Sequence, residues 1–350
     1  MLLRASAASV AISCENEAMK AMILGQFGPI EKNPLGLADV PVPQPGSEDI
    51  LVKVKVCGVC HTDLHTVEGE LPEVKLPIIP GHQVVGIVEG AGQRTGRFKK
   101  GDRIGAAWLH FACGTCAFCR RGRENLCENG RFTGYHANGG YAEYMTIPEK
   151  FAYAIPAIFP DEEASTLLCA GIIGYRALRL SNIRPGGCLG LYGFGASAHV
   201  AIQVAGHWGC RVYVFSRSKE HQDLARKLGA AWTGSAKEIP PTKTDSAIIF
   251  APAGPLVLDA LLNTEKGGTV ALAGITMTPI PEMDYRKHLY HERTLRSVAN
   301  ATRQDGEELL KIAAEIPIRT TTQVFPLEEA NKVLRFLKEG RISGAAVLKI

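Results

Sequence analysis

Four cysteines at short, regular intervals form the strongest chemical pattern in this sequence. The pattern is Cys-x2-Cys-x2-Cys-x7-Cys, at Cys113, Cys116, Cys119 and Cys127. Four thiolates in one short segment can close a tetrahedral shell around zinc, which leaves no coordination position for a substrate. The spacing therefore predicts a structural zinc site. It disfavours unligated structural cysteines, and the nearby arginines form no basic stripe of the kind that a nucleic-acid-binding zinc ribbon would need.

Two further cysteines and a histidine are spread along the chain but could also meet at a metal. They are Cys60 in the run Cys-His-Thr-Asp, His82 in Gly-His-Gln, and Cys169. Taken alone, a buried cysteine is usually a small core residue. Together, two thiolates and one imidazole make the three-ligand set of a catalytic zinc with one open position. Such a zinc polarises a carbonyl oxygen or lowers the pKa of a bound alcohol.

The third chemical motif is rich in glycine. Gly193-Phe-Gly195-Ala-Ser-Ala198 follows an apolar segment predicted to be a strand and opens a predicted helix. The glycines let the backbone approach a pyrophosphate, and the helix N-terminus offers partial positive charge. In this strand–turn–helix setting the motif predicts a dinucleotide-binding site.

The elements that would position these motifs fall into two parts. From residue 21 to about 160, short strand-like runs such as 50–56 and 83–89 alternate with dense turn signals, which predicts an antiparallel barrel or sandwich. After residue 160, predicted helices and strands take turns, as in a doubly wound parallel sheet. These helices are 161–180, 196–207 and 219–228, and the strands are 188–192, 211–215, 246–250 and 269–273. The last fifty residues are predicted to hold one helix, 327–339, and a closing strand, 346–350.

Composition excludes several classes of protein. The chain has 350 residues, which corresponds to about two domains, and its 46% hydrophobic and 21% charged residues are ordinary for a globular protein. No apolar run approaches the roughly 18 residues of a membrane span. The net charge is +4, and the densest basic clusters are only Lys99-Lys100 and Arg120-Arg121, so neither nucleic acid nor a membrane is an expected partner.

The cysteines and the N-terminus bear on the compartment. Ten cysteines, several of them clustered, without a convincing secretion signal indicate metal binding in a reducing compartment, the cytoplasm. Residues 1–19 could be a weak transit-like segment, but the simpler interpretation is a disordered extension.

In order and spacing, these motifs resemble the zinc-containing medium-chain alcohol dehydrogenase family of the bacterial and yeast type, from about residue 21 to residue 350. The resemblance rests on Cys57-Gly-Val-Cys-His-Thr-Asp63, Gly81-His82, the four-cysteine group, Gly101-Asp102-Arg103, Cys169-Ala-Gly171 and Gly193-Phe-Gly195. It implies a GroES-like β-barrel catalytic domain over 20–170, a doubly wound Rossmann domain over 171–299 and a return to the catalytic domain over 300–350.

The resemblance also implies roles for individual residues. Cys60, His82 and Cys169 match the catalytic zinc ligands, and the four-cysteine group matches the structural zinc lobe. Asp63 matches the carboxylate that orients a ligand, Thr62 the hydroxyl that bonds the substrate oxygen, and His65 the far end of a proton relay through the cofactor ribose. His61 matches a pyrophosphate contact, and Gly193, Gly195 and Ala198 match the cofactor loop. Trp108 matches the indole that narrows the substrate pocket.

Three positions depart from the family pattern. Gln83 stands where the family often has Glu, Gly344-Ala345 replaces a Gly-Arg pair that meets the pyrophosphate, and Ser216 replaces the acid at the end of the second Rossmann strand. A carboxylate there would repel a 2′-phosphate, whereas the Ser216 hydroxyl and the Arg217 guanidinium can bind one. The sequence therefore predicts a preference for NADP(H), with NAD(H) as the alternative.

The expected function is hydride transfer between a nicotinamide cofactor and a small, primary alcohol or aldehyde. The expected cofactors are two zinc ions per chain and NADP, and the expected assembly is a homo-oligomer, a tetramer or a dimer. One alternative is a zinc-free quinone or enone reductase of the same superfamily, against which the three zinc ligands argue. The other is a non-catalytic dinucleotide sensor, which would have no need of Thr62 and His65.

Overall fold

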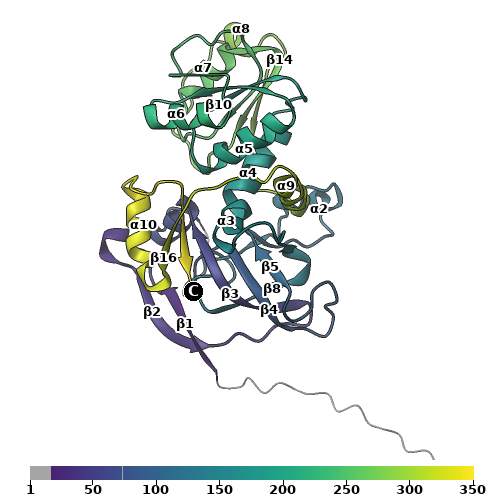
Figure 1. Cartoon of the computed structure of the whole chain (residues 1–350), viewed down its shortest axis with the longest axis vertical. Coiled ribbons are helices and arrows are strands. Elements are labelled where there is room, and N and C mark those ends of the chain that lie inside the picture. Colours follow the sequence, from purple (N-terminus) through teal and green to yellow (C-terminus); the bar gives the residue numbers. More distant parts are fainter. Residues whose placement is uncertain (1–16, 73) are drawn as a thin grey trace, which may run out of the picture.

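The computed structural model describes residues 17–72 and 74–350 (Figure 1). Most of the predicted extension at 1–19 therefore lies outside the described residues. The first strand, β1 (Ala18–Leu24), already includes residues 18 and 19, so the expected domain start at residue 20 falls inside this strand. Among the described residues, no helix combines the length and apolarity that crossing a membrane requires.

A seven-stranded sheet forms the half of the molecule at the bottom of Figure 1. Its order is β16-β17-β3-β4-β5-β9, with β8 paired to β3, and all its pairs are antiparallel except β16 with β17. In β3 (Asp49–Val59), Ile50, Val52 and Val54 are buried while Lys53 and Lys55 are exposed, as the alternating pattern predicts.

The remaining elements of this half are short. Its other strands are β2 (Leu35–Pro41), β4 (Gln83–Ala91), β5 (Arg103–Ala106), β6 (Leu109–Phe111), β7 (Arg131–Phe132), β8 (Tyr144–Pro148) and β9 (Ala152–Ala154). Its helices are η1 (Ile30–Lys32), α1 (His61–Glu68), α2 (Ala117–Arg120), η2 (Glu124–Leu126) and η3 (Glu149–Phe151). Strand β1 pairs with β2 and β6 with β7 in two small separate sheets.

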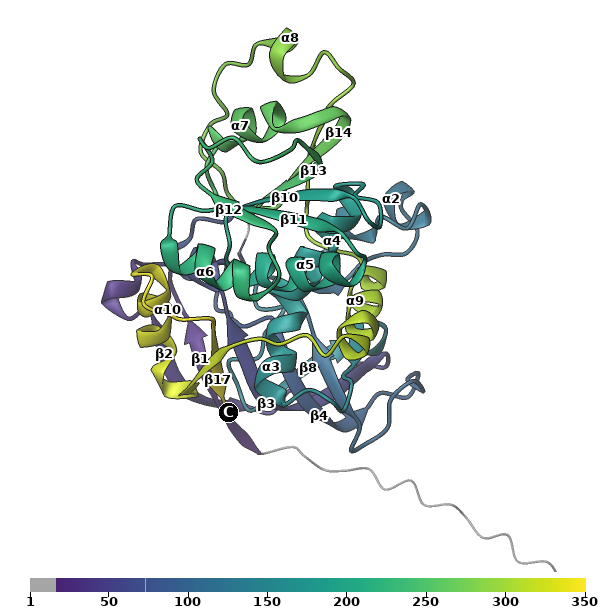
Figure 2. The same cartoon turned by 45° about the horizontal axis from the view of Figure 1, so that its top comes forward.

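The second half is a six-stranded, fully parallel sheet of order β12-β11-β10-β13-β14-β15. This order reverses beside the first strand, as in a doubly wound dinucleotide-binding domain, and confirms the predicted fold class. Its strands are β10 (Cys188–Tyr192), β11 (Arg211–Phe215), β12 (Trp232–Gly234), β13 (Thr244–Ile249), β14 (Thr264–Leu272) and β15 (Thr294–Ser297). Its helices are α5 (Ala196–His207), α6 (Lys219–Lys227), α7 (Leu256–Leu262) and α8 (Tyr285–His288), and Figure 2 shows the sheet with α5 and α6 on the side of the catalytic half.

The helix predicted over 161–180 is interrupted. The chain forms α3 (Asp161–Thr166), then a π-helical turn (Leu167–Gly171), then α4 (Ile172–Leu180). This run joins the two halves (Figure 1), and one buried cluster contains Val56 and Val85 of the catalytic sheet together with Leu189 of the parallel sheet. Cys169 lies within the π turn, a type of irregularity that is frequent at functional sites.

The prediction of a single helix in the last fifty residues is wrong. A second one, α9 (Arg303–Glu315), precedes β16 (Thr322–Pro326), η5 (Leu327–Glu329), α10 (Ala330–Lys338) and β17 (Ala345–Lys349). Thr302 caps α9 in a capping box with Asp305, a signal that the sequence contains. The buried Asp305 also binds Arg176 at 3.0 Å and Arg179 at 2.6 Å, which fastens α9 to α4.

Candidate active site

Cys60 occupies the N-cap of α1, immediately after β3. Its Sγ accepts a hydrogen bond from the Thr62 N–H at 3.4 Å, and its own N–H donates to the Asp63 carboxylate at 2.9 Å. This reciprocal pairing is a capping box in which a thiol takes the place of the usual hydroxyl. A helix N-terminus favours negative charge, so α1 presents Cys60 where a thiolate is stabilised.

Cys60, His82 and Cys169 meet at one point between β3, β4 and the π turn. The Cys60 Sγ lies 3.4 Å from His82 Nε2 and 3.9 Å from the Cys169 Sγ, and His82 Nε2 lies 3.4 Å from the Cys169 Sγ. For Zn–S bonds of about 2.3 Å and Zn–N bonds of about 2.0 Å, tetrahedral ligand atoms are about 3.5–3.8 Å apart. The donor triangle therefore fits a zinc ion with one further position.

Asp63 contacts two of the three ligand residues, Cys60 and His82. Its carboxylate is 2% exposed, and one oxygen accepts the Cys60 N–H while the other lies 3.0 Å from His82 Nδ1. An imidazole that donates through Nδ1 presents Nε2 as a metal ligand. Asp63 thus orients two of the three candidate ligands at once.

Burial and charge oppose each other at these residues. Burial lowers the pKa of His82, but the Asp63 carboxylate and the Cys60 thiolate raise it to about 10. The hydrogen bond between the two thiols holds the pKa of Cys60 well below its ordinary value and raises that of Cys169. A zinc ion would need the neutral imidazole and the two thiolates as ligands, so its affinity should depend on pH.

The candidate relay residues stand along α1. Thr62 and His65 are half-buried and His61 is exposed, and the His61 and His65 rings lie 6.4 Å apart. Residues three apart share a helix face, so Thr62 and His65 can act in series. His65 Nδ1 also contacts Glu70, at 2.5 Å, a partner that the sequence analysis did not identify.

Trp108 lies beside the metal triangle, within a group of aromatic rings. Its ring meets His82 edge-on at 5.0 Å, stacks on Phe132 at 5.2 Å and lies 5.5 Å from Tyr135. Phe132 and Tyr135 were missed because nothing in their local sequence distinguishes them from core aromatics.

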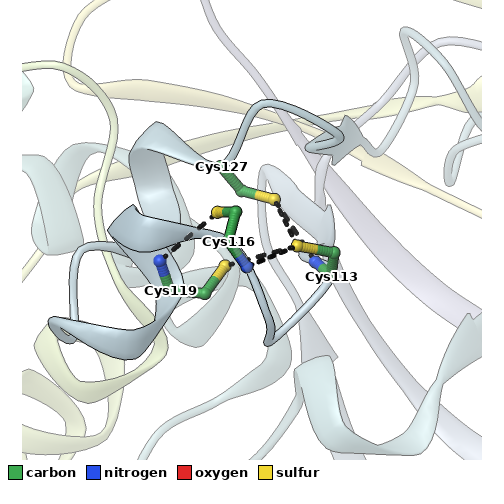
Figure 3. Close-up of side chains that lie close together, drawn as sticks. All are labelled: Cys113, Cys116, Cys119 and Cys127. Carbon is green, nitrogen blue, oxygen red and sulfur yellow. Dashed lines mark hydrogen bonds between the residues drawn. The ribbon is translucent and has the colours of Figure 1, made fainter.

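The four remaining cysteines of the zinc motifs converge in a separate lobe (Figure 3). The Cys113 Sγ lies 3.5 Å from that of Cys127 and 4.0 Å from that of Cys119, and all four sulfur atoms lie within 4.8 Å of one another. Backbone N–H groups donate to the sulfurs of Cys113, Cys116 and Cys127. Hydrogen bonds from the Thr115 and Cys116 backbone lower the pKa of Cys113 to about 6. The lobe fits a closed four-thiolate zinc site.

This lobe also docks on the segment that returns from the parallel sheet. The Glu124 carboxylate accepts hydrogen bonds from the Arg303 backbone N–H at 2.8 Å and from its guanidinium at 2.6 Å. The Asn125 side chain donates to the Ala299 carbonyl at 2.7 Å. Neither Glu124 nor Asn125 was identified from the sequence, because their partners lie more than 170 residues away.

The glycine-rich turn has the geometry that its motif requires. Gly193 has φ +87°, and a Cβ there would lie 2.9 Å from the Ala251 backbone nitrogen. Gly195, at the N-cap of α5, has open space where a Cβ would stand, which allows a ligand to approach. Ala198 is fully buried against the sheet, as the small third residue of such a motif should be.

Ser216 and Arg217 follow β11 directly, at the carboxyl edge of the parallel sheet. The Ser216 hydroxyl accepts the Ser218 N–H at 3.3 Å, and Arg217 is exposed. Glu220 lies on α6, as expected, and its carboxylate accepts a 3.3 Å hydrogen bond from Ser218. No carboxylate stands at the end of the strand itself.

The structure also describes the surroundings of Gln83 and Ala345, the two other departures from the family pattern. Gln83, at the start of β4, is 3% exposed, and its Nε2 has no hydrogen-bond partner. Ala345 begins β17, where its N–H donates to the Thr321 carbonyl at 2.8 Å. Ala345 offers no side chain that could reach a pyrophosphate.

Comparison with known proteins agrees with this geometry. The family model described as the alcohol dehydrogenase GroES-like domain matches residues 46–157, and the zinc-binding dehydrogenase model matches residues 196–315. The probable alcohol dehydrogenase AdhA of Mycobacterium tuberculosis is 47% identical over 337 residues, which cover 95% of this chain and 97% of that relative. An alcohol dehydrogenase of Geobacillus stearothermophilus is 36% identical over 341 residues, which cover 95% and 100%. The cobalt- and zinc-bound thermostable alcohol dehydrogenase from Pyrobaculum aerophilum has a TM-score of 0.85 at 26% identity, over 95% of this chain and 100% of that one.

Proposed function

This chain belongs to the zinc-containing medium-chain alcohol dehydrogenase family, and on that premise we propose that it interconverts small primary alcohols and aldehydes with NADP(H) as the preferred cofactor. The observation that carries the proposal is the triangle of Cys60, His82 and Cys169. Three converging ligands leave a fourth position for an exchangeable oxygen.

These residues would hold a zinc ion, and Asp63 would keep His82 and Cys60 in place. When bound, zinc supplies Lewis acidity toward the oxygen of an alcohol or aldehyde. The Cys113 lobe would hold the second zinc of the chain and contribute folding energy. The Pyrobaculum aerophilum relative, which has the same fold, is described as cobalt- and zinc-bound, in keeping with this proposal.

The residues of α1 would handle the proton of the alcohol. The Thr62 hydroxyl is proposed to accept the substrate O–H and to pass a proton to a cofactor ribose hydroxyl. His65, one turn further along the same helix face, would take it up near the surface, since its side chain is 16% exposed. The nicotinamide, when bound, supplies or accepts the hydride, and binding it close to the substrate would raise the rate of transfer.

The cofactor preference is proposed from the end of β11. Gly193, Gly195 and Ala198 would hold the pyrophosphate with His61, and Ser216 and Arg217 would receive a 2′-phosphate. The exposed guanidinium of Arg217 is free to turn toward such a group, whereas an acid at the strand end would repel it. The Glu220 carboxylate next to Ser218 opposes this preference, so Arg217 has to outweigh it.

The proposed substrate class follows from Trp108. An indole packed edge-on against the ligand His82 and backed by Phe132 narrows the space beside the open position. Slim primary substrates should therefore fit better than bulky secondary ones.

We also propose that the chain forms a homo-oligomer, a dimer or a tetramer, in the cytoplasm. Strand β15 is the last strand of the parallel sheet, and the exposed Tyr285 and Tyr290 precede it. An unpaired sheet edge beside exposed aromatics favours association. The clustered thiols need the reducing conditions of the cytoplasm.

Steady-state kinetics test the proposal. The purified protein is assayed with NADPH and with NADH on a panel of primary and secondary alcohols and their carbonyl products. A higher kcat/KM with NADPH and with primary substrates supports it. A higher kcat/KM with NADH refutes the cofactor preference, and absence of turnover refutes the dehydrogenase function.

A further inference from the structure

The C-terminal end of α1 brings one carboxylate onto His65. The Glu70 N–H donates to the His65 carbonyl at 2.9 Å, and the Gly69 N–H donates to the Thr66 carbonyl at 3.3 Å. These two bonds form the six-to-one and five-to-two pairing that ends many helices. The backbone of Glu70 is therefore tied to the backbone of His65, one turn of helix after the proposed relay residue.

This turn requires a glycine at position 69. Its φ is +75°, in the left-handed region, and a Cβ there would lie 2.9 Å from the Cγ of Phe27. The turn thus depends on a glycine and on the ring packed over it. The resulting side-chain contact joins the Glu70 Oε2 to His65 Nδ1 at 2.5 Å.

The other carboxylates near this end of α1, Glu68 and Glu31, bind a lysine and not His65. Glu68 binds Lys338 of α10 at 2.7 Å, and Lys338 also binds Glu31 at 3.0 Å. His61, on the preceding turn, lies 6.4 Å from the His65 ring. Among these groups, Glu70 is the carboxylate in hydrogen-bond contact with His65.

We propose that Glu70 is a positioning residue that sets the tautomer of His65, an inference that rests on the proposed function. A carboxylate accepts but does not donate, so Nδ1 carries the hydrogen and Nε2 keeps its lone pair. The Nε2 lone pair then takes the proton that leaves the cofactor ribose hydroxyl. The imidazolium that forms then returns a proton to bulk water.

If the contact only stabilised the fold, removal of the Glu70 carboxylate would lower the melting temperature and leave the tautomer of His65 unchanged. Glu70 is half exposed, and an exposed ion pair contributes little to folding stability. Its removal should therefore leave the melting temperature unchanged. The tautomer of His65 should change nonetheless, because within residues 17–72 and 74–350 no other acceptor contacts Nδ1.

The test is nitrogen NMR of histidine-labelled holoenzyme, in which the Nδ1 and Nε2 signals report which ring nitrogen carries the hydrogen. Glu70→Ala removes the acceptor, Glu70→Gln keeps an acceptor oxygen without charge, and Glu31→Ala is the matched control for loss of a surface carboxylate. His65→Asn identifies the His65 signal. We expect Nδ1–H in the wild type, Glu70→Gln and Glu31→Ala, and a shift toward Nε2–H in Glu70→Ala.

The kinetics of alcohol oxidation provide the second readout. In Glu70→Ala, kcat should fall about three- to tenfold with little change in KM, less than the roughly 100-fold lost with a whole proton-transfer group. Glu70→Gln and Glu31→Ala should stay within about twofold of the wild type. An Nε2–H tautomer in the wild type, or unchanged tautomer and kcat in Glu70→Ala, overturns the role of Glu70 alone. Absence of wild-type turnover overturns the proposed function and the relay with it.

Discussion

Replacing Asp63 with asparagine removes the charge from the carboxylate that positions two candidate zinc ligands. Asp63 accepts the Cys60 N–H at 2.9 Å and faces His82 Nδ1 at 3.0 Å, with both side chains almost fully buried. Asparagine keeps one acceptor oxygen, so its NH2 group must face one of these two donors. The variant loses one charge-assisted hydrogen bond, a cost of about 1.5–3 kcal/mol.

Because Asp63 orients two of the zinc ligands, loss of this hydrogen bond should weaken zinc binding and lower kcat together. We expect zinc affinity and kcat each to fall by about 10- to 100-fold, as with other carboxylates that orient a ligand histidine. Zinc transfer to a chelating dye, followed alongside turnover of one aldehyde, measures both quantities. Asp39→Asn, an exposed change on β2, is the matched control. Wild-type zinc release and kcat in Asp63→Asn would refute the reasoning.

Three further changes probe other parts of the molecule. Cys116→Ser should lower the melting temperature and the zinc content, because a closed zinc site contributes folding energy; an unchanged melting temperature would contradict the structural-zinc assignment. Trp108→Ala should raise relative activity on branched or aromatic substrates, as measured by kcat/KM over a substrate panel, and an unchanged profile would place the indole outside the pocket. Arg217→Ala should weaken NADPH binding by about 1.5–3 kcal/mol and NADH binding far less, and equal losses in titrations with the two cofactors would rule out a 2′-phosphate contact.

Much of the fold was predictable because its signals are local. The strands at 188–192 and 211–215 coincide with β10 and β11, since buried parallel strands are short apolar runs between turn signals. The four-cysteine lobe was predictable for the same reason, because its ligands lie within fifteen consecutive residues. Cys60, His82 and Cys169 are far apart in the chain. Their residue types suggested a three-ligand zinc set and the resemblance to a family supported it, but the structure was needed to place their ligand atoms within 4.8 Å of one another.

The features that the sequence analysis missed depend on long-range contacts or on weak local signals. The π turn around Cys169 has the composition of an ordinary helix, so its irregularity had no local signal. Helix α9 was missed although Thr302 and Asp305 form a recognisable cap, because Gly306 weakens the helical pattern at its start. The contact of Glu124 with Arg303 joins residues 179 positions apart in the chain, so no local signal could predict it.

The most direct test of the account compares zinc content, fold and turnover in the wild type and in Cys169→Ser. The wild type should hold about two zinc ions per chain, since two separate ligand groups are present, and should reduce a simple aldehyde. Cys169→Ser should hold about one zinc ion, keep its circular dichroism spectrum and lose turnover, because the π turn contributes one ligand and the sheets do not depend on that ion. Near-normal turnover by Cys169→Ser would contradict the catalytic-zinc site on which the proposed function rests.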